Sequence, residues 1–206
     1  MKDYVGLSRV HFDEQAKDYD DKDTVYYSKY PKISCKDVAD RLKKMDYQNL
    51  LDVGCGTGYL IELLQKERKA DYYGLDLSPA MLWKARQKFK DTVFLTEGES
   101  DHLPYEDNMF DVVTCIQSFH HYPYPGKAMK EAYRVLKPGG FYILSDTGMG
   151  GIAKWFYNHL FLKGMNSGDY AVYSREDIRK LMEANGFKSC GDWNIAKMIY
   201  TVIGRK

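Results

Sequence analysis

The sequence predicts an α/β fold: one globular domain with a mostly parallel β-sheet covered by helices. From Leu50 onward, short β-rich runs alternate with helix-like segments, as in chains where crossover helices join parallel strands. Near the C-terminus two β-like runs, 186–194 and 196–205, are joined so closely that we expect them to pair antiparallel. At 206 residues the chain can bury one sizeable core, which favours one domain over two.

Residues 1–48 are expected to form a helical cap. This cap contains two helix-like segments, roughly 9–19 and 34–45. The tyrosine-rich stretch YDDKDTVYYSKYP joins them.

Residues 49–146 carry the strands of the predicted core. The expected strands lie at 49–53, 71–76, 92–96, 110–115 and 140–146. The helix before the third strand begins with Ser78 as N-cap and Pro79 at the first helical position, where a missing N–H costs nothing. The helix before the fifth strand is predicted to stop at Pro138-Gly139-Gly140.

The pattern changes after the fifth strand. Residues 147–173 combine glycines with an aromatic, helix-like segment, which indicates an insertion or lid. Regular structure resumes at 174–206, where Ser174 and Asp177 open a helix that ends at Gly186. The two antiparallel runs complete the chain.

Charge and composition exclude several kinds of partner. The 30 basic and 29 acidic side chains leave a formal charge of +1, so the chain offers no electrostatic footprint for nucleic acid or an anionic membrane. No run approaches the roughly 20 apolar residues of a membrane span, and the first residues lack a signal-like apolar core, so we expect a cytoplasmic protein. The four cysteines lack the spacing of a zinc site or of a disulfide framework, and we predict no metal.

The stretch LLDVGCGTGYL places Gly54, Gly56 and Gly58 between a strand and a helix. Bare glycines let a ligand approach the backbone, and the following helix presents free N–H groups. The spacing is GxGxG rather than the GxGxxG of a dinucleotide site, and no Gly-Lys-Ser/Thr run is present, so a diphosphate is not the favoured ligand. Asp76, at the end of the second strand, is placed to accept hydrogen bonds from two ribose hydroxyls.

Glu99 follows the third strand and is expected at the same edge of the sheet, within reach of an exocyclic amine such as adenine N6; by itself it could equally be a solvated side chain. Taken together, LLDVGCGTG, GLDLSPAML, GESDHLPYEDNMFDVV and EAYRVLKPGG resemble, in order and spacing, the motifs of the class I S-adenosylmethionine-dependent methyltransferases. The branch that the chain resembles is that of ubiquinone/menaquinone biosynthesis and related small-molecule enzymes. The segment HFDEQAKDYDD is similar to the N-terminal cap of that family.

The resemblance implies a Rossmann-like, seven-stranded sheet with an antiparallel last strand and helices on both faces, and S-adenosylmethionine as cofactor. The residues that it assigns to the methionine and ribose are Tyr19, Asp52, Gly54, Cys55, Gly56, Gly58, Asp76 and Ile116. Those that it assigns to the adenine are Leu77, Met81, Glu99 and Ser100. Many relatives carry Asp at the position of Glu99, so this chain departs from them by one methylene.

His120 and His121 are the candidate catalytic residues, because they follow the fourth strand and should reach the same edge of the sheet. An imidazole with an ordinary pKa of about 6.5 suits proton abstraction from an acceptor at neutral pH. Either histidine could instead pack against the next helix or cap it. The Asn/Asp-Pro-Pro-Tyr signature of adenine methylation in nucleic acid is absent from this position.

Aromatic residues make up 15% of the chain and gather in the cap, in the loop after the fourth strand and in the insertion. They include Tyr19, Tyr26, Tyr27, Tyr30, Phe119, Tyr122, Tyr124, Trp155, Phe156, Tyr157 and Phe161. They predict either an apolar, aromatic-walled pocket for a small-molecule acceptor or a lid that packs on itself. The sequence favours a small-molecule methyltransferase that works by in-line displacement. The alternatives are a non-catalytic cofactor-binding or regulatory protein and, less favoured, a nicotinamide-dependent oxidoreductase.

Overall fold

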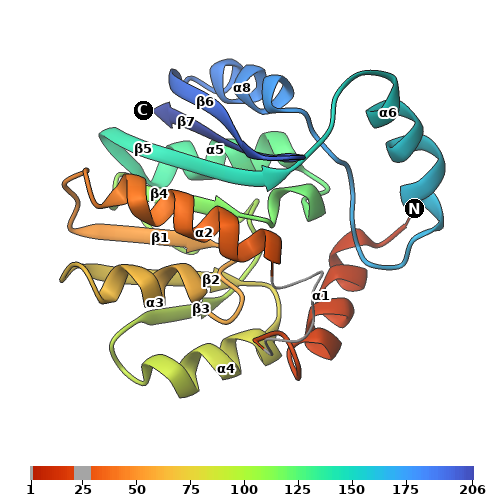
Figure 1. Ribbon diagram of the computed structural model, residues 1–206. Helices are drawn as coiled ribbons and strands as arrows, with labels where there is room; N and C mark the ends of the chain where they lie inside the picture. The colour runs from red at the N-terminus through yellow and green to blue at the C-terminus, as the bar shows by residue number, and fades with distance from the viewer. Residues whose placement is uncertain (1, 21–28) are drawn as a thin grey trace.

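Figure 1 shows the computed structural model of the chain, which describes residues 2–20 and 29–206. Its strands are β1 (Asn49–Val53), β2 (Asp71–Asp76), β3 (Phe94–Glu97), β4 (Phe110–Ile116), β5 (Leu136–Thr147), β6 (Lys188–Ala196) and β7 (Ile199–Arg205). Its helices are α1 (Tyr4–Gln15), α2 (Lys29–Leu42), α3 (Tyr59–Gln65), α4 (Pro79–Phe89), α5 (Pro125–Val135), α6 (Gly151–Phe156), α7 (Leu162–Gly164) and α8 (Arg175–Ala184), with a 3₁₀ turn η1 (Phe119–His121) and a π-helical turn η2 (Tyr157–Phe161). None of these helices combines the length and the apolar composition that crossing a bilayer requires.

The strands form a seven-stranded sheet in the order β3-β2-β1-β4-β5-β7-β6. The pairs from β3 to β5 are parallel, whereas β7 runs antiparallel to both β5 and β6. The predicted fold class, a Rossmann-like sheet with an antiparallel last strand, is therefore confirmed. Because β1 to β5 are parallel, their carboxyl ends meet at one edge of the sheet.

Helices cover both faces of this sheet, as the sequence predicts. On one face α2, α3 and α4 pack on the strands through buried side chains such as Leu42, Leu64 and Phe89. On the other face α5 and α8 pack through Met129 and Ile178. Each fully buried side chain of this size contributes about 1.5–3 kcal/mol of hydrophobic free energy. The two helical layers therefore stabilise the sheet whose edge carries the loops of the site.

The two cap helices begin earlier than predicted. They span 4–15 and 29–42, where the pattern predicts 9–19 and 34–45. Helix α1 starts where it does because the Asp3 carboxylate accepts a hydrogen bond from the Gly6 N–H at 2.9 Å. Apolar periodicity identifies the middle of a helix but not its ends, and this N-cap lies outside the periodic part.

The run that was expected to end a helix belongs to β5 instead. Helix α5 ends at Val135, and the Pro138-Gly139-Gly140 run continues as strand. Its backbone groups pair with the end of the chain: Gly139 N–H donates to the Lys206 carbonyl and Lys206 N–H to the Gly140 carbonyl, both at 2.9 Å. The prediction is wrong because this pairing partner lies more than sixty residues away, out of reach of a local stop signal.

Figure 1 shows where the additions to the sheet lie: α1 and α6 stand beyond the carboxyl ends of the parallel strands. The segment 147–173 contains α6, η2 and α7 before the chain returns to α8. Both additions therefore flank the edge at which the sequence places the site.

Candidate functional site

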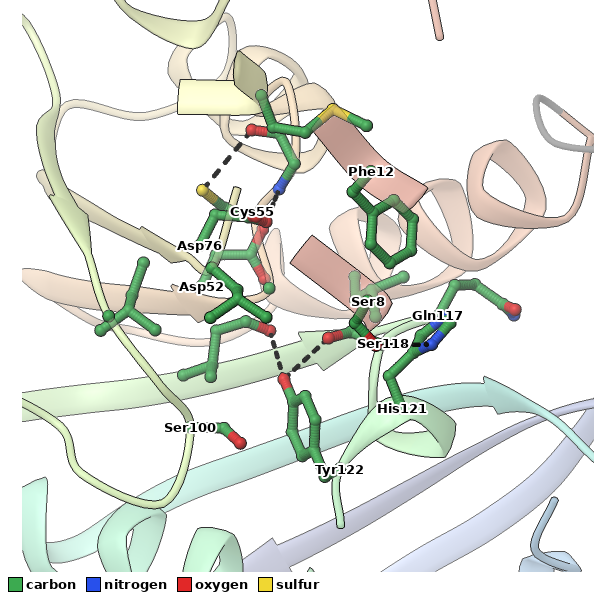
Figure 2. A pocket seen from close by; sticks show the side chains of 18 of the residues that line it. Ser8, Phe12, Asp52, Cys55, Asp76, Ser100, Gln117, Ser118, His121 and Tyr122 are labelled. Carbon is green, nitrogen blue, oxygen red and sulfur yellow. Dashed lines mark hydrogen bonds between the residues drawn. The ribbon is translucent and has the colours of Figure 1, made fainter. Parts of the chain in front are cut away.

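A cavity lies at the carboxyl edge of the sheet and encloses about 1020 Å³, counting the part that is open to solvent. The turn after β1, the ends of β2 and β3, the loop after β4 and the cap all contribute to its walls (Figure 2). With the exception of Gly58, every residue that the sequence assigns to the cofactor lines this cavity. The structure thus brings together five segments that the sequence relates only by their order.

The glycine turn after β1 presents bare backbone to the cavity. Gly54 N–H and Cys55 N–H both donate to the Leu75 carbonyl, at 2.7 and 3.0 Å, which fastens the turn to β2. Gly56 has φ +54°, and among the described residues a Cβ there would have one neighbouring atom within 4 Å, a Tyr19 ring carbon at 4.0 Å. Gly58 differs, because a Cβ at that position would lie 2.3 Å from the Phe89 ring of α4. Gly58 therefore serves helix packing, which explains why it is absent from the cavity wall.

Asp76 connects the two turns that border the cavity. Its Oδ2 accepts a hydrogen bond from Gly56 N–H at 2.7 Å, and its Oδ1 accepts one from Ser78 N–H at 2.9 Å. Burial raises the pKa of Asp76 to about 6, although these backbone donors favour the ionised form. A carboxylate offers about four lone-pair positions, so Asp76 keeps acceptor capacity for a ligand.

Asp52, near the end of β1, is a second buried carboxyl group in the cavity wall. Its Oδ1 accepts a hydrogen bond from the Thr114 hydroxyl at 2.7 Å. Burial, together with a smaller contribution from the nearby Asp76 carboxylate, raises the pKa of Asp52 to about 7. A positively charged ligand would favour the ionised forms of both groups. Strongly perturbed carboxyl groups in a cavity are typical of functional sites.

The far end of the cavity combines apolar and polar walls. Leu77 and Met81, at the start of α4, contribute apolar surface, while Glu99 and Ser100 follow β3 and bring polar groups. Ser78 caps α4 as predicted: its hydroxyl oxygen accepts a hydrogen bond from Met81 N–H at 3.1 Å. This wall suits a flat, polar-edged ring such as a purine.

The cap is fastened over the cavity by two carboxylates. Asp13 accepts a hydrogen bond from the Ser78 hydroxyl at the start of α4. Asp20 accepts one from the Thr57 hydroxyl in the glycine turn at 2.7 Å. Tyr19, beside Asp20, lines the cavity, and burial raises the pKa of its phenol. The cap segment singled out in the sequence therefore supplies both anchors and a wall.

The two candidate catalytic histidines differ in position. His121 lines the cavity, whereas His120 does not. Burial lowers the pKa of His121 to about 3, so its imidazole is neutral at pH 7 and only weakly basic. Burial also opposes the charged form of His120, but the Asp146 carboxylate, 2.7 Å from Nδ1, outweighs it and raises the pKa. That His120 or His121 acts as a general base toward the acceptor stays a prediction.

Several residues in the cavity wall were missed by sequence reasoning. They include Ser8, Phe12, Cys35, Gln117 and Ser118 (Figure 2 shows all but Cys35 labelled). Gln117 has φ +50°, and its amide bridges two elements, donating to the Ser34 hydroxyl at 2.9 Å and accepting from the Thr147 hydroxyl at 2.6 Å. Phe12 could have been found, because it stands inside the quoted cap segment. Gln117 directly follows the predicted Ile116.

The aromatic insertion does not wall the cavity. Trp155, Phe156 and Phe161 are 54%, 47% and 64% exposed, and no described side chain between 147 and 173 lines the cavity. Of the two alternatives that the sequence left open, this exposure favours a segment that packs on itself: Trp155 stacks on His159, and Tyr157 stacks on Phe161. Tyr26 and Tyr27 lie outside the described residues.

Comparison with known proteins agrees with this geometry. Residues 51–144 match the family described as Methyltransferase domain. The demethylmenaquinone methyltransferase of Lactiplantibacillus plantarum is 41% identical over 106 residues, 48% of this chain and 45% of that protein. The demethylmenaquinone methyltransferase of Deinococcus radiodurans is 31% identical over 165 residues, 69% of this chain and 68% of that protein. The chain belongs to the class I S-adenosylmethionine-dependent methyltransferases.

A solved structure supports the fold of this methyltransferase over nearly its whole length. The S-adenosylmethionine-dependent methyltransferase from Aquifex aeolicus has a TM-score of 0.72 and 22% identity, with 94% of this chain and 97% of that chain covered. The matched part of this chain spans about half to two thirds of the length of the two curated relatives.

The residues of the methyltransferase fit S-adenosylmethionine as cofactor. The bare turn at Gly56 leaves room for the nucleoside beside the backbone. Asp76 would retain acceptor positions for ribose hydroxyls, and the carboxyl group of Asp52 would complement the cationic methionine end. Leu77 and Met81 would provide apolar surface for the adenine ring.

Proposed function

We propose that this methyltransferase transfers a methyl group to a small aromatic acceptor of the quinone class by in-line displacement. One observation carries the proposal: a single cavity extends from Asp76 to a second wall that contains Phe12, Tyr122 and Pro123. The same cavity therefore combines the residues assigned to the cofactor with an aromatic wall against which an acceptor could lie. A cavity of this kind suits a small molecule.

Positioning is the main contribution that these residues can make. S-adenosylmethionine supplies an electrophilic methyl group on a positively charged sulfur. The cap holds Phe12 and Tyr19 over the cavity, which excludes water and restricts the orientation of an acceptor. Alignment of this kind can lower a barrier by about 7–11 kcal/mol, and no protein nucleophile is required.

The second wall favours an aromatic acceptor that carries oxygen atoms. The ring of Phe12 packs edge-on against the imidazole of His121, with 4.9 Å between the ring centroids. Ser118 and Tyr122 share a hydrogen bond of 2.7 Å beside this apolar surface and can redirect it to a ligand. The curated relatives, which are demethylmenaquinone methyltransferases, support an acceptor of this type.

The test is methyl transfer from S-adenosylmethionine with a deuterated methyl group. A reduced demethylated naphthoquinone is the probe, and a simple aliphatic amine is the control. We expect mass spectrometry to detect the labelled methyl group on the naphthoquinol alone.

Two further measurements separate the alternatives. If calorimetry detects binding of S-adenosylhomocysteine but no compound in a metabolite extract gains a methyl group, the non-catalytic alternative is correct. A thermal shift with NAD that exceeds the shift with S-adenosylhomocysteine would instead favour an oxidoreductase.

A further inference from the structure

Three side chains of the kind that bind metals meet beside the cavity. His120 and His121 lie on η1, and Asp169 lies on the segment that follows α7. Their ligand atoms are all within 4.8 Å of one another. Nε2 of His120 is 3.5 Å, and Nε2 of His121 is 3.6 Å, from the same carboxylate oxygen, Oδ1 of Asp169.

Hydrogen bonds at the opposite side of each ring orient both imidazoles. Nδ1 of His120 lies 2.7 Å from Oδ1 of the buried Asp146 carboxylate. Nδ1 of His121 lies 3.4 Å from the Ser8 hydroxyl, which itself donates to the Gly168 carbonyl at 3.2 Å. A neutral imidazole that donates through Nδ1 carries its lone pair on Nε2. Each Nε2 can therefore present a lone pair, and both Nε2 atoms lie close to the same carboxylate oxygen of Asp169.

The two separations from Asp169 Oδ1 to the histidine nitrogens fit a shared cation better than direct hydrogen bonds. An N–H···O hydrogen bond normally measures about 2.7–3.2 Å between its heavy atoms. Bonds of about 2.0–2.2 Å from a tetrahedral ion to nitrogen and oxygen place neighbouring ligand atoms about 3.3–3.6 Å apart. The distances of 3.5 and 3.6 Å to Asp169 fall in the second range.

We propose that His120, His121 and Asp169 form a binding site for a divalent transition-metal ion such as Zn²⁺. Two imidazoles with one carboxylate suit this class of ion, whereas Mg²⁺ prefers ligands that are all oxygen. Asp146 holds His120 as the outer carboxylate found beside metal-bound histidines. Three protein ligands would leave one position of a tetrahedral ion free, and one of these ligands, His121, lines the cavity.

The rest of the chain holds the three ligands in place. The N–H groups of Tyr170 and Ala171 donate to the His120 carbonyl, at 2.8 and 3.1 Å, which ties the segment after α7 to η1. The Ser167 hydroxyl donates to the other oxygen of Asp169, leaving Oδ1 to the histidines. His11 on α1 also faces both Asp169 and His121. The ligand set is thus built into the fold and does not depend on mobile surface side chains.

The experiment uses the full chain, treated with a chelator and dialysed, with the exposed thiol removed by Cys190→Ser so that it cannot bind metal. We expect calorimetry with Zn²⁺ to give one ion per chain, and no saturable heat with Mg²⁺. Both Asp169→Asn and Asp146→Asn should weaken Zn²⁺ binding about 10–100-fold. His159→Gln is the matched control: it removes an exposed histidine of the insertion and should leave Zn²⁺ affinity unchanged.

Two checks keep the proposal open to refutation. Asp169→Asn should bind S-adenosylhomocysteine as tightly as the parent, which shows that the variant is folded. If it does not, Co²⁺ bound to the parent protein decides: intense visible absorption of a four-coordinate ion supports the site, and a pale six-coordinate spectrum overturns it. Absence of Zn²⁺ binding by the parent, or binding that survives both Asp169→Asn and Asp146→Asn, also overturns it.

Discussion

Two halves of the cavity are assembled in different ways. The cofactor half, formed by the turn after β1 and the ends of β2 and β3, is held by contacts between neighbouring motifs, such as the bond of Gly56 to Asp76, twenty residues apart. The proposed acceptor side, formed by α1, η1 and the residues directly after η1, depends on remote contacts: Ser8 meets His121, 113 residues away, and Gly168, 160 residues away and outside the cavity wall. The residues of the cofactor half can thus be recognised from short sequence motifs. The residues of the acceptor side come together only when segments far apart in the sequence pack against each other.

The largest expected effect is on the cofactor half. Gly54 has φ +76°, and a Cβ at this position would lie 2.0 Å from the Ser118 hydroxyl oxygen. We expect Gly54→Ala to lower the free energy of unfolding by about 3 kcal/mol, because backbone strain and steric overlap add. It should also abolish measurable binding of S-adenosylhomocysteine.

Gly126→Ala is the matched control in urea unfolding. Gly126 lies in α5, and a Cβ there meets no atom of the described part of the chain within 4 Å. This variant should be as stable as the parent or gain up to about 1 kcal/mol from helix propensity. Equal losses in the two variants would contradict the assignment of Gly54 to a strained turn.

Asp76→Ala should give the next largest effect. It removes a carboxylate that holds Gly56 and Ser78 and retains acceptor positions for ribose hydroxyls. We expect the Kd for S-adenosylhomocysteine to rise about 100-fold, equivalent to about 3 kcal/mol. Asp71→Ala, at the exposed start of the same strand, should leave that Kd unchanged in calorimetry.

These positions also show how much of the molecule the sequence predicts. The strands at 49–53 and 71–76 and the N-cap at Ser78 follow from local signals, since each lies within one strand–turn–helix unit. The order of the strands in the sheet has no such local signal. The anchors Asp13 and Asp20 stand in a segment that the sequence singles out, but their partners Ser78 and Thr57 are set by tertiary packing. The approach of Asp169 to the two histidines has no local signal.

A smaller effect is expected from pH. The pKa of Asp52 is raised to about 7 by burial, and a cationic methionine end would lower it on binding. Affinity for S-adenosylmethionine should therefore be highest above pH 7 and fall as the pH drops, by up to tenfold per unit. Asp76 also faces Asp52, and so do the thiols of Cys35, Cys55 and Cys115, whose raised pKa values keep them uncharged.

Stability should depend on pH in the opposite direction. The folded chain keeps the Asp52 proton between about pH 4 and pH 7, whereas the unfolded chain releases it near its ordinary pKa of 3.8. Stability from this group is therefore present at the low end of the window and is lost as the pH rises. Asp52→Asn should flatten both profiles, in urea unfolding and in calorimetry. If the pH profile of Asp52→Asn matches that of the parent, another titrating group causes the pH dependence.

The smallest effects are expected from two aromatic substitutions, one in the cavity wall (Phe12) and one in the insertion (Trp155). Phe12 lines the cavity, whereas Trp155 is 54% exposed and stacks on His159 of its own segment. We expect Phe12→Ala to raise the KM for the acceptor several-fold and to leave the Kd for S-adenosylhomocysteine within about twofold. The substitution removes an aromatic ring from the acceptor side of the cavity and leaves the cofactor half unchanged. Trp155→Ala should change neither constant and should alter stability by less than about 0.5 kcal/mol, as is usual for surface substitutions. If Trp155→Ala changed acceptor preference while Phe12→Ala did not, the acceptor would lie under the insertion and not against α1.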